Sequence, residues 1–288
     1  MEGSVLSQVL LPLVLSFIMF GMGMSLTRDD FARLLRMPLA VVAGLAGQII
    51  LLPLLAFGLV LILDLPAYLA IGIMVLAACP GGTTSNLFSH VARANLALSI
   101  TLTAIATVIC VFTTPFIVEF SLRYFEAENQ SFSVLEMTLK MIVLLLVPVL
   151  IGLFVRHKAP MFALRQENLF RKLAVIFMLL MIAGISWQER DMLVQSFPNV
   201  FVLTIALNAL ATLMGVAIAK LAMLSKRDAI TLGIEIGTQN ATMAIIISLT
   251  FLDDPTYSIA CGVYGVTMYL GASALVLWSK REAQPEQV

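Results

Sequence analysis

Charged residues are scarce in this chain. Only 12% of its 288 residues are Asp, Glu, Lys or Arg, whereas 60% are hydrophobic. A soluble domain of this size could not bury so much apolar surface, so the composition excludes a soluble globular protein. The formal net charge is zero, which gives no sign of a nucleic-acid partner. We therefore expect an integral membrane protein whose surroundings are the lipid bilayer.

Side chains typical of metal sites and catalytic centres are also few. The chain has two histidines and three cysteines. Cys79, Cys110 and Cys261 lie inside apolar segments and show no metal-ligand spacing, while His90 and His157 lie at the ends of such segments. This pattern indicates neither an enzyme nor a transition-metal site.

Long apolar segments dominate the chain instead. A bilayer core about 30 Å thick needs roughly 20 apolar residues per helix. Each segment is too continuous for a barrel strand, which would alternate over about 10 residues. We expect an all-α polytopic membrane protein in which the basic stretch 156–172 is a solvated connector rather than an amphipathic surface segment. The nine predicted membrane helices are 6–26, 39–63, 67–92, 95–122, 134–155, 173–187, 199–224, 229–251 and 257–279.

Basic residues predict the orientation, because Lys and Arg are retained on the cytoplasmic side of a membrane. With nine spans, fourteen of the 17 Lys and Arg residues fall on one side. The opposite loops hold Arg123 and Arg190, and Lys140 lies at the start of the fifth span. We therefore expect the N-terminus outside and the C-terminus in the cytoplasm of a multi-pass cell-membrane protein, in the inner membrane if it is bacterial. The first span follows Glu2 and lacks a basic n-region, which argues against a cleavable signal peptide.

Two of the apolar segments carry polar interruptions. "CPGGTTSN" (79–86) lies in the third and "EIGTQN" (235–240) lies in the eighth. The two segments run in opposite directions in the predicted topology, and such a pair is typical of inverted repeats and points to a transport site. Gln48 and Asn208 interrupt the spans that precede them. The residues predicted to break the helices are Pro80, Gly81, Gly82 and Gly237.

Glu235 lies near the middle of the eighth segment. An ionisable side chain at mid-bilayer costs on the order of 2.5–3.5 kcal/mol, so it normally faces a cavity or a partner. No Lys or Arg lies in the central part of any predicted span, so its partner is a proton, a cation or a set of hydrogen-bond donors. Gln239 and Asn240, at i+4 and i+5, supply oxygen ligands for a small cation. A protonated Glu235 bonded to a neighbouring helix is the structural alternative.

Hydroxyl groups follow one face of the fourth predicted helix. Ser99, Thr103 and Thr107 are spaced i, i+4 and i+8. On spacing alone this stripe is either packing between helices or part of a polar site. The small residues of "GMGM" (21–24) predict a close approach between helices.

These motifs together resemble the bile acid:sodium symporter family. The resemblance rests on "CPGGTTSN", the following "ARANLALSITLT", "EIGTQN" and the early "IMFGMGMSLTRDDF", and it covers almost the whole chain. It implies a secondary transporter of the apical sodium-dependent bile acid transporter type, and the short tails favour a bacterial homologue. The family has two inverted five-helix repeats. This chain begins at the second helix, which leaves nine helices in repeats of 4+5, with the third and eighth discontinuous and crossing.

The resemblance also implies the positions of the sites. Two sodium ions are expected, with an organic anion on the cavity side of the crossing near Thr83 and Asn240. The first ion would be held by Ser85, Asn86, Ser99, Thr103 and Glu235. The second would be held by Gln48, Glu235 and Gln239, with the backbone carbonyls of Ile236 and Thr238. A single transporter domain, 1–288, would contain a core (about 39–122 and 199–279) and a panel (about 6–26 and 134–187).

The expected function is sodium-coupled symport of an organic anion into the cell by alternating access. The substrate stays open between a bile acid and a smaller carboxylate, because Met268 and Tyr269 stand where some family members have a cavity-facing histidine. The oligomeric state is also open, a monomer being one option. The alternatives are a proton-coupled carrier in which Glu235 cycles protons, a metalloid exporter that uses Cys79, and a membrane sensor. The many neutral oxygen ligands favour sodium.

Overall fold

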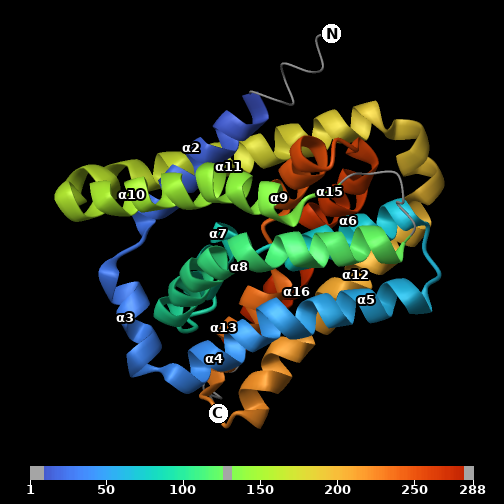
Figure 1. Cartoon of the computed structure of the whole chain (residues 1–288). Coiled ribbons are helices and arrows are strands. Elements are labelled where there is room, and N and C mark those ends of the chain that lie inside the picture. Colours follow the sequence, from blue (N-terminus) through green and yellow to red (C-terminus); the bar gives the residue numbers. More distant parts are fainter. Residues whose placement is uncertain (1–9, 126–131, 282–288) are drawn as a thin grey trace.

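The described part of the protein is all helical. The computed structural model describes residues 10–125 and 132–281. Within these ranges the chain forms helices joined by short turns, with no named strand, so the all-α prediction is confirmed (Figure 1). Residues 6–9 of the first predicted span and the polar tail after Arg281 lie outside the described residues.

Six helices among the described residues are long and apolar enough to cross a membrane. A seventh candidate is the bent pair α2 (Leu11–Ser25) and α3 (Arg28–Arg36), which meet at 63°. The six are Pro38–Ile62, α8 (Leu96–Tyr124), Val134–Lys158, α11 (Pro160–Gln188), α12 (Arg190–Leu221) and Pro255–Arg281. Three of them are composite: α4 (Pro38–Ala46), η2 (Gly47–Leu51) and α5 (Leu52–Ile62); α9 (Val134–Met141), η3 (Ile142–Leu146) and α10 (Val147–Lys158); η5 (Pro255–Tyr257), α15 (Ser258–Thr267) and α16 (Tyr269–Arg281).

The third and eighth predicted spans are each two short helices. α6 (Ala67–Ala78) is followed by α7 (Thr83–Val91), and α13 (Lys226–Gly237) is followed by α14 (Ala241–Ile246), which continues as the π-helical η4 (Ile247–Phe251). At 1.5 Å per residue, the 12 residues of α6 extend only about 18 Å, which is shorter than a bilayer core. By length, therefore, neither half of a broken span crosses a membrane alone.

The sixth predicted span begins earlier than expected. α10 runs to Lys158 and α11 begins at Pro160, so the solvated connector predicted over 156–172 is wrong. Pro160 is suited to the first position of a helix, and the Gln, Glu, Arg, Lys and Leu residues that follow are good helix formers. The charged residues of this stretch led to the prediction of a loop, although the stretch has a high helix propensity.

A local irregularity surrounds Gln48. The π-helical turn η2 contains this residue and ends two residues before Pro53. Because proline has no backbone N–H and its ring crowds the preceding turn, the regular hydrogen-bond ladder is interrupted there. In the second predicted span, the π-helical turn therefore changes the direction in which the following side chains point, and it does so at Gln48.

The helices form two groups (Figure 1). In the first, α2 packs against α10 and α11. The close approach predicted for 21–24 is confirmed, because a Cβ atom on Gly152 of α10 would lie only 2.8 Å from the backbone nitrogen of Met24. In the second group, α12 packs against α13, and α8 packs against α6 and α13. The two pairs of broken helices lie within this second group, and α14 also contacts α2 and α11.

Candidate functional site

The two helix breaks lie against each other. α6 ends at Ala78 and α7 begins at Thr83, while α13 ends at Gly237 and α14 begins at Ala241. The N–H of Gly82 donates to the carbonyl of Thr238 at 3.1 Å, and the N–H of Asn240 donates to the carbonyl of Pro80 at 3.0 Å. Gly81 and Gln239 form an isolated antiparallel bridge. The unwound segments therefore satisfy part of each other's backbone, as buried irregular backbone in a membrane must.

Gly81 allows a carboxylate to approach the crossing. A Cβ atom at this position would lie 2.5 Å from Oε1 of Glu235, closer than real Cβ contacts occur. Glycine is required here because of this close approach. The break in the third predicted span therefore makes room for the acidic residue of the eighth.

The Glu235 carboxylate collects hydroxyl groups from two other helices. Its side chain is buried. Oε2 accepts hydrogen bonds from Oγ of Ser85 on α7 and from Oγ of Ser99 on α8, both at 2.7 Å. Oε1 accepts a hydrogen bond from Oγ1 of Thr103, one turn further along α8. Four of the five residues predicted around the first ion are thus in direct contact.

The other members of this prediction lie nearby or elsewhere. Oδ1 of Asn86, next to Ser85 in sequence, is buried and has no hydrogen-bond partner among the described residues. Thr107, the third hydroxyl of the predicted stripe, donates to the carbonyl of Thr103 at 2.7 Å instead. Such a bond within one helix is a packing arrangement. Within the stripe, Ser99 and Thr103 therefore contact the Glu235 carboxylate, whereas the hydroxyl of Thr107 bonds within α8.

A second polar group lies around two glutamines. Nε2 of Gln48 donates to Oε1 of Gln239 at 2.6 Å and to the carbonyl of Cys79 at 3.2 Å. Nε2 of Gln239 donates to the carbonyl of Ile236 at 2.8 Å. The structure thus brings together Gln48, Gln239 and the Ile236 carbonyl. The hydrogen bonds of the Glu235 carboxylate go to the hydroxyls of the first group, not to these amides.

Thr238 completes the break on this side. Its carbonyl accepts the hydrogen bond from Gly82, whereas its Oγ1 is buried without a partner among the described residues. Buried polar atoms are normally paired, so the hydroxyl of Thr238 and Oδ1 of Asn86, both without a partner among the described residues, call for a ligand or solvent.

Asn208 forms the corresponding contact in the second half of the chain. Its Nδ2 donates to the carbonyls of Gly237 (2.8 Å) and Met268 (3.1 Å), and its Oδ1 accepts from the N–H of Gly271 at 2.9 Å. Tyr264, which the sequence did not single out, also donates to the Gly237 carbonyl at 2.9 Å. A phenol inside an apolar segment gives no signal in sequence, because tyrosine packs in cores without such a role.

These side chains and carbonyls supply oxygen ligands that suit a small hard cation. They are one carboxylate, several hydroxyls, amide oxygens and carbonyls freed by the helix breaks, which are the oxygen ligands preferred by hard ions. No Lys or Arg forms an ion pair with Glu235 among the described residues. The described residues also contain no group of three His, Cys, Asp or Glu side chains placed for a transition metal. The residues present therefore fit sodium better than a soft or nitrogen-seeking metal.

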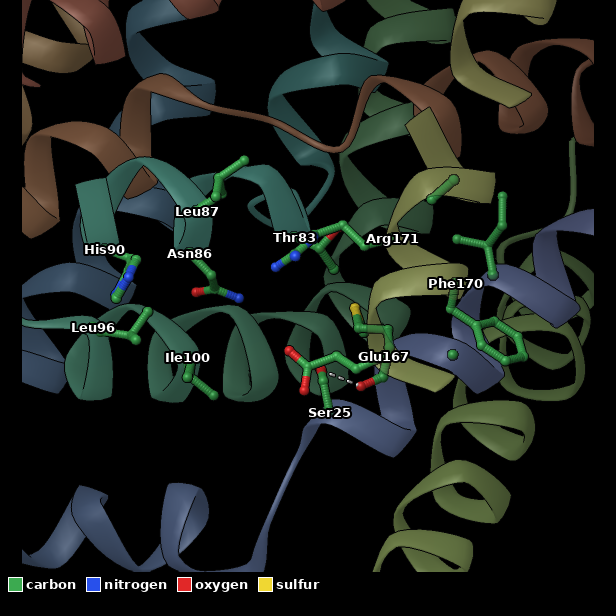
Figure 2. Close-up of a pocket in the computed structure, with 14 residues that line it drawn as sticks. Ser25, Thr83, Asn86, Leu87, His90, Leu96, Ile100, Glu167, Phe170 and Arg171 are labelled. Atoms are coloured by element: carbon green, nitrogen blue, oxygen red, sulfur yellow. Dashed lines mark hydrogen bonds between the residues drawn. The ribbon is translucent and has the colours of Figure 1, made fainter. Parts of the chain in front are cut away.

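A cavity of about 280 Å³ lies beside the crossing (Figure 2). It lies between the two helix groups and is lined by the C-terminal half of α2, by α7 from Thr83 to His90, by the first turns of α8 and by residues 167–174 of α11. Thr83 and Asn86 contribute to its wall. Its lining residues are Ile18, Gly21, Met22, Ser25, Thr83, Asn86, Leu87, His90, Leu96, Ile100, Glu167, Phe170, Arg171 and Ala174.

A smaller hollow of about 40 Å³ continues from this cavity to the crossing. Thr83 lines both spaces, and Asn240 lines the smaller one. Oδ1 of Asn240 accepts a hydrogen bond from the N–H of Met243 at 3.0 Å, so this side chain also caps α14. The two residues predicted to contact the anion thus face one space, and their role there stays a prediction.

Two charged residues of the cavity wall were missed. Glu167 and Arg171 were assigned to the solvated connector, yet they line the cavity, and Figure 2 shows Glu167 reaching into it from α11. His90, an exposed residue near the end of α7, lines the same space. The available signal was the helical spacing of Glu167, Phe170, Arg171 and Ala174, which continues the buried face of α11.

The remaining residues singled out in sequence lie around the site. Met268 is buried and lines the smaller hollow, whereas the ring of Tyr269 stacks on Phe88 with centroids 5.4 Å apart. The Cys79 thiol is buried and donates to the carbonyl of Val75 at 3.2 Å. Cys79 contributes its backbone carbonyl to Gln48, and its thiol is absent from the lining of the cavity.

Comparison with known proteins decides the family. The model of the sodium bile acid symporter family matches residues 12–196. The chain belongs to this family. Its members are transporters and not enzymes, and the chain is a multi-pass membrane protein of that kind.

Family relatives match over most of this chain. It is 30% identical to the uncharacterized sodium-dependent transporter YocS of Bacillus subtilis, over 93% of this chain and 82% of the relative. It is 29% identical to the probable sodium/metabolite cotransporter BASS1 of Arabidopsis thaliana, over 95% and 67% respectively. It is 24% identical to the human ileal sodium/bile acid cotransporter, over 86% and 71%. These family relatives differ in the substrate that their names give.

Proposed function

We propose that this chain is a sodium-coupled symporter that carries an organic anion into the cell. The observation that carries this proposal is the buried Glu235 carboxylate, which has hydroxyl partners from two other helices and no basic partner among the described residues. A full negative charge in such a place is costly unless a cation neutralises it. The names of its relatives, which describe sodium-dependent carriers, support sodium as that cation.

Two sodium ions fit the polar groups of the crossing. The first would bind Glu235 together with the hydroxyls of α7 and α8 and the amide oxygen of Asn86. The second would bind Glu235, the two glutamine side chains and the carbonyls of Ile236 and Thr238. Since Glu235 belongs to both sets, it couples them electrostatically, and the binding of one ion should depend on the other.

The acidic group of an organic anion would bind at the smaller hollow, at Thr83 and Asn240, with the rest of the molecule in the larger cavity. The first turn of a helix presents unpaired N–H groups and positive dipole, which favours an anionic group. α7 and the α14–η4 helix both begin at this hollow. Cation and anion would therefore lie on opposite faces of the crossing. Because their charges attract each other, binding of one would favour binding of the other.

The larger cavity favours a small polar acid over a sterol. A sterol tail in this space would cover the charged groups of Glu167 and Arg171 without offering either a hydrogen bond, and removing charge from water costs several kcal/mol even though Arg171 keeps its bond to Oδ1 of Asn168. A carboxylate substrate with hydroxyl or amide groups offers both residues a partner. We therefore place the substrate among small hydroxy- or amido-carboxylates.

Transport would proceed by movement of a panel against a core. The panel comprises α2 and α9–α11, and the core comprises α4–α8 and α12–α16, with the cavity between them. In the predicted orientation the C-terminal end of α2 and the N-terminal end of α8, which line the cavity, would face the cytoplasm, so the structure would correspond to an inward-facing state. The N-terminus would lie outside and the C-terminus inside.

We further propose nine spans in inverted repeats of 4+5. The matching contacts of two amides support this assignment. Gln48 donates to the carbonyl of Cys79, just after the end of α6, and Asn208 donates to the carbonyl of Gly237, at the end of α13. The same role in each half, at antiparallel breaks, is what two related repeats would produce.

The test is stabilisation of the purified chain by small organic acids in sodium and in potassium. Symport predicts that sodium raises the melting temperature, that one class of acid raises it further, and that potassium does neither. Glu235→Ala should abolish the sodium effect. Stabilisation by acids that depends on pH and not on sodium would instead favour a proton-coupled carrier.

A further inference from the structure

A second contact joins α8 and α13, two of the three helices that carry the Glu235 cluster. Nδ2 of Asn95, at the N-cap of α8, donates to Oδ1 of Asp228 in the first turn of α13 at 2.7 Å. The N–H of Asn95 donates to Oγ1 of Thr231 at 2.9 Å. Asp228 and Thr231 are buried, and Oγ of Ser225 donates to the other carboxylate oxygen of Asp228 at 2.6 Å.

This contact lies on the same helical faces as the proposed sodium ligands. On α8, Asn95 is one turn before Ser99 and two turns before Thr103. On α13, Asp228 and Thr231 lie seven and four residues before Glu235. Residues at these spacings share one side of a helix. The two helices therefore meet along one seam, with the Asn95 contact at one end and the Glu235 cluster at the other.

We propose that Asn95 and Asp228 are positioning residues that fix the register of α8 against α13. The proposal rests on the proposed sodium function, because what they position is the first sodium site. A hydrogen bond to a buried carboxylate is directional and strong compared with apolar packing. A shift of one helix along the other would break it and would also move Ser99 and Thr103 away from Glu235.

Local roles alone do not account for the pair. Oδ1 of Asn95 caps α8 by accepting from the N–H of Leu98 at 3.1 Å, and Asp228 accepts from Ser225 within α13. Both local roles would be met without the Asn95–Asp228 bond, because they use other atoms of the two side chains. The Asn95–Asp228 bond between α8 and α13 is therefore not needed for either local role.

Exchanging the two side chains tests the proposal. Asn95→Asp keeps a good N-cap but sets two carboxylates opposite each other. The double variant Asn95→Asp/Asp228→Asn restores one donor and one acceptor with the charge unchanged. The full chain, purified in lipid nanodiscs, is titrated with sodium, and the half-saturating concentration is read from its thermal stabilisation.

Asn95→Asp should raise half-saturating sodium about tenfold, and the double variant should return it to within about threefold of the parent. Ser133→Ala, which removes the N-cap of α9 in the panel, should leave it unchanged. If Asn95→Asp does not fold, Thr231→Val removes one acceptor of the seam without adding charge and should raise half-saturating sodium about threefold.

Unaltered half-saturating sodium in Asn95→Asp or Thr231→Val would overturn the proposal, and so would a double variant no better than Asn95→Asp. A lower melting temperature without sodium, at unchanged half-saturation, would mean that the pair is only structural and would likewise overturn it. Failure of the parent chain itself to respond to sodium would instead contradict the proposed function.

Discussion

Replacing Asn86 with alanine separates ion binding from stability. Oδ1 of Asn86 is buried and has no hydrogen-bond partner among the described residues. Without the ion, the substitution therefore removes an unsatisfied acceptor, whose burial costs about 1–3 kcal/mol. With sodium bound, it removes a ligand to a charge, an interaction of about 1.5–3 kcal/mol. Stability without sodium should thus stay equal or rise, while sodium affinity falls about ten- to a hundredfold.

Sodium-dependent uptake into proteoliposomes measures this effect. Half-saturating sodium should increase in Asn86→Ala, and the melting temperature in potassium should not fall. Ser89→Ala is the matched control, because Oγ of Ser89 is also buried and unpaired on α7 but lies outside the proposed site. Wild-type sodium affinity in Asn86→Ala would refute the reasoning, as would an equal loss in Ser89→Ala.

Three further predictions follow from the site. Asn208→Ala leaves the carbonyl of Met268 without its hydrogen-bond donor. Thermal unfolding should therefore show a melting temperature lower by several degrees, in sodium and in potassium alike. An effect seen only in sodium would contradict this prediction. Glu167→Leu/Arg171→Leu should shift uptake from hydroxy-carboxylates toward apolar acids, and an unchanged ratio of the two uptake rates would argue against the cavity as the substrate path. With two sodium ions per monoanion, an inside-negative potential of 100 mV adds about 2.3 kcal/mol, or about fiftyfold in accumulation of labelled substrate; insensitivity to voltage would exclude this ratio.

The polar centre could be predicted because lipid penalises its residues so strongly. Glu235 and the interruptions at 79–86 and 235–240 are costly in apolar segments unless they line a shared polar site, whereas Ser99 and Thr103 were assigned to that site through the resemblance to the family. The hydrogen bonds to Glu235 place the hydroxyls of three predicted ligands on one carboxylate. Which atoms bond to which could not be derived, because this depends on how three helices pack.

The wall of the cavity was not predicted, for a physical reason. The start of α11 is rich in charge, and charge in a membrane protein usually marks a loop. High helix propensity kept the chain helical there. Because Glu167 and Arg171 are one turn apart on α11, they lie on the same helical face, and both line the cavity. Similarly, the π-helical turn at Gln48 follows from Pro53 and from packing, and a hydropathy pattern does not register such a change of phase.

Glu235 is the residue proposed to bind sodium at the crossing. Equilibrium binding of radioactive sodium to the purified chain tests this proposal most directly, with Glu235→Gln as the variant because glutamine keeps the size and one acceptor oxygen. The account predicts saturable binding of about two ions per chain in the parent and almost none in the variant, since both proposed sites share this carboxylate. Equal binding in Glu235→Gln, or no saturable binding in the parent, would contradict it.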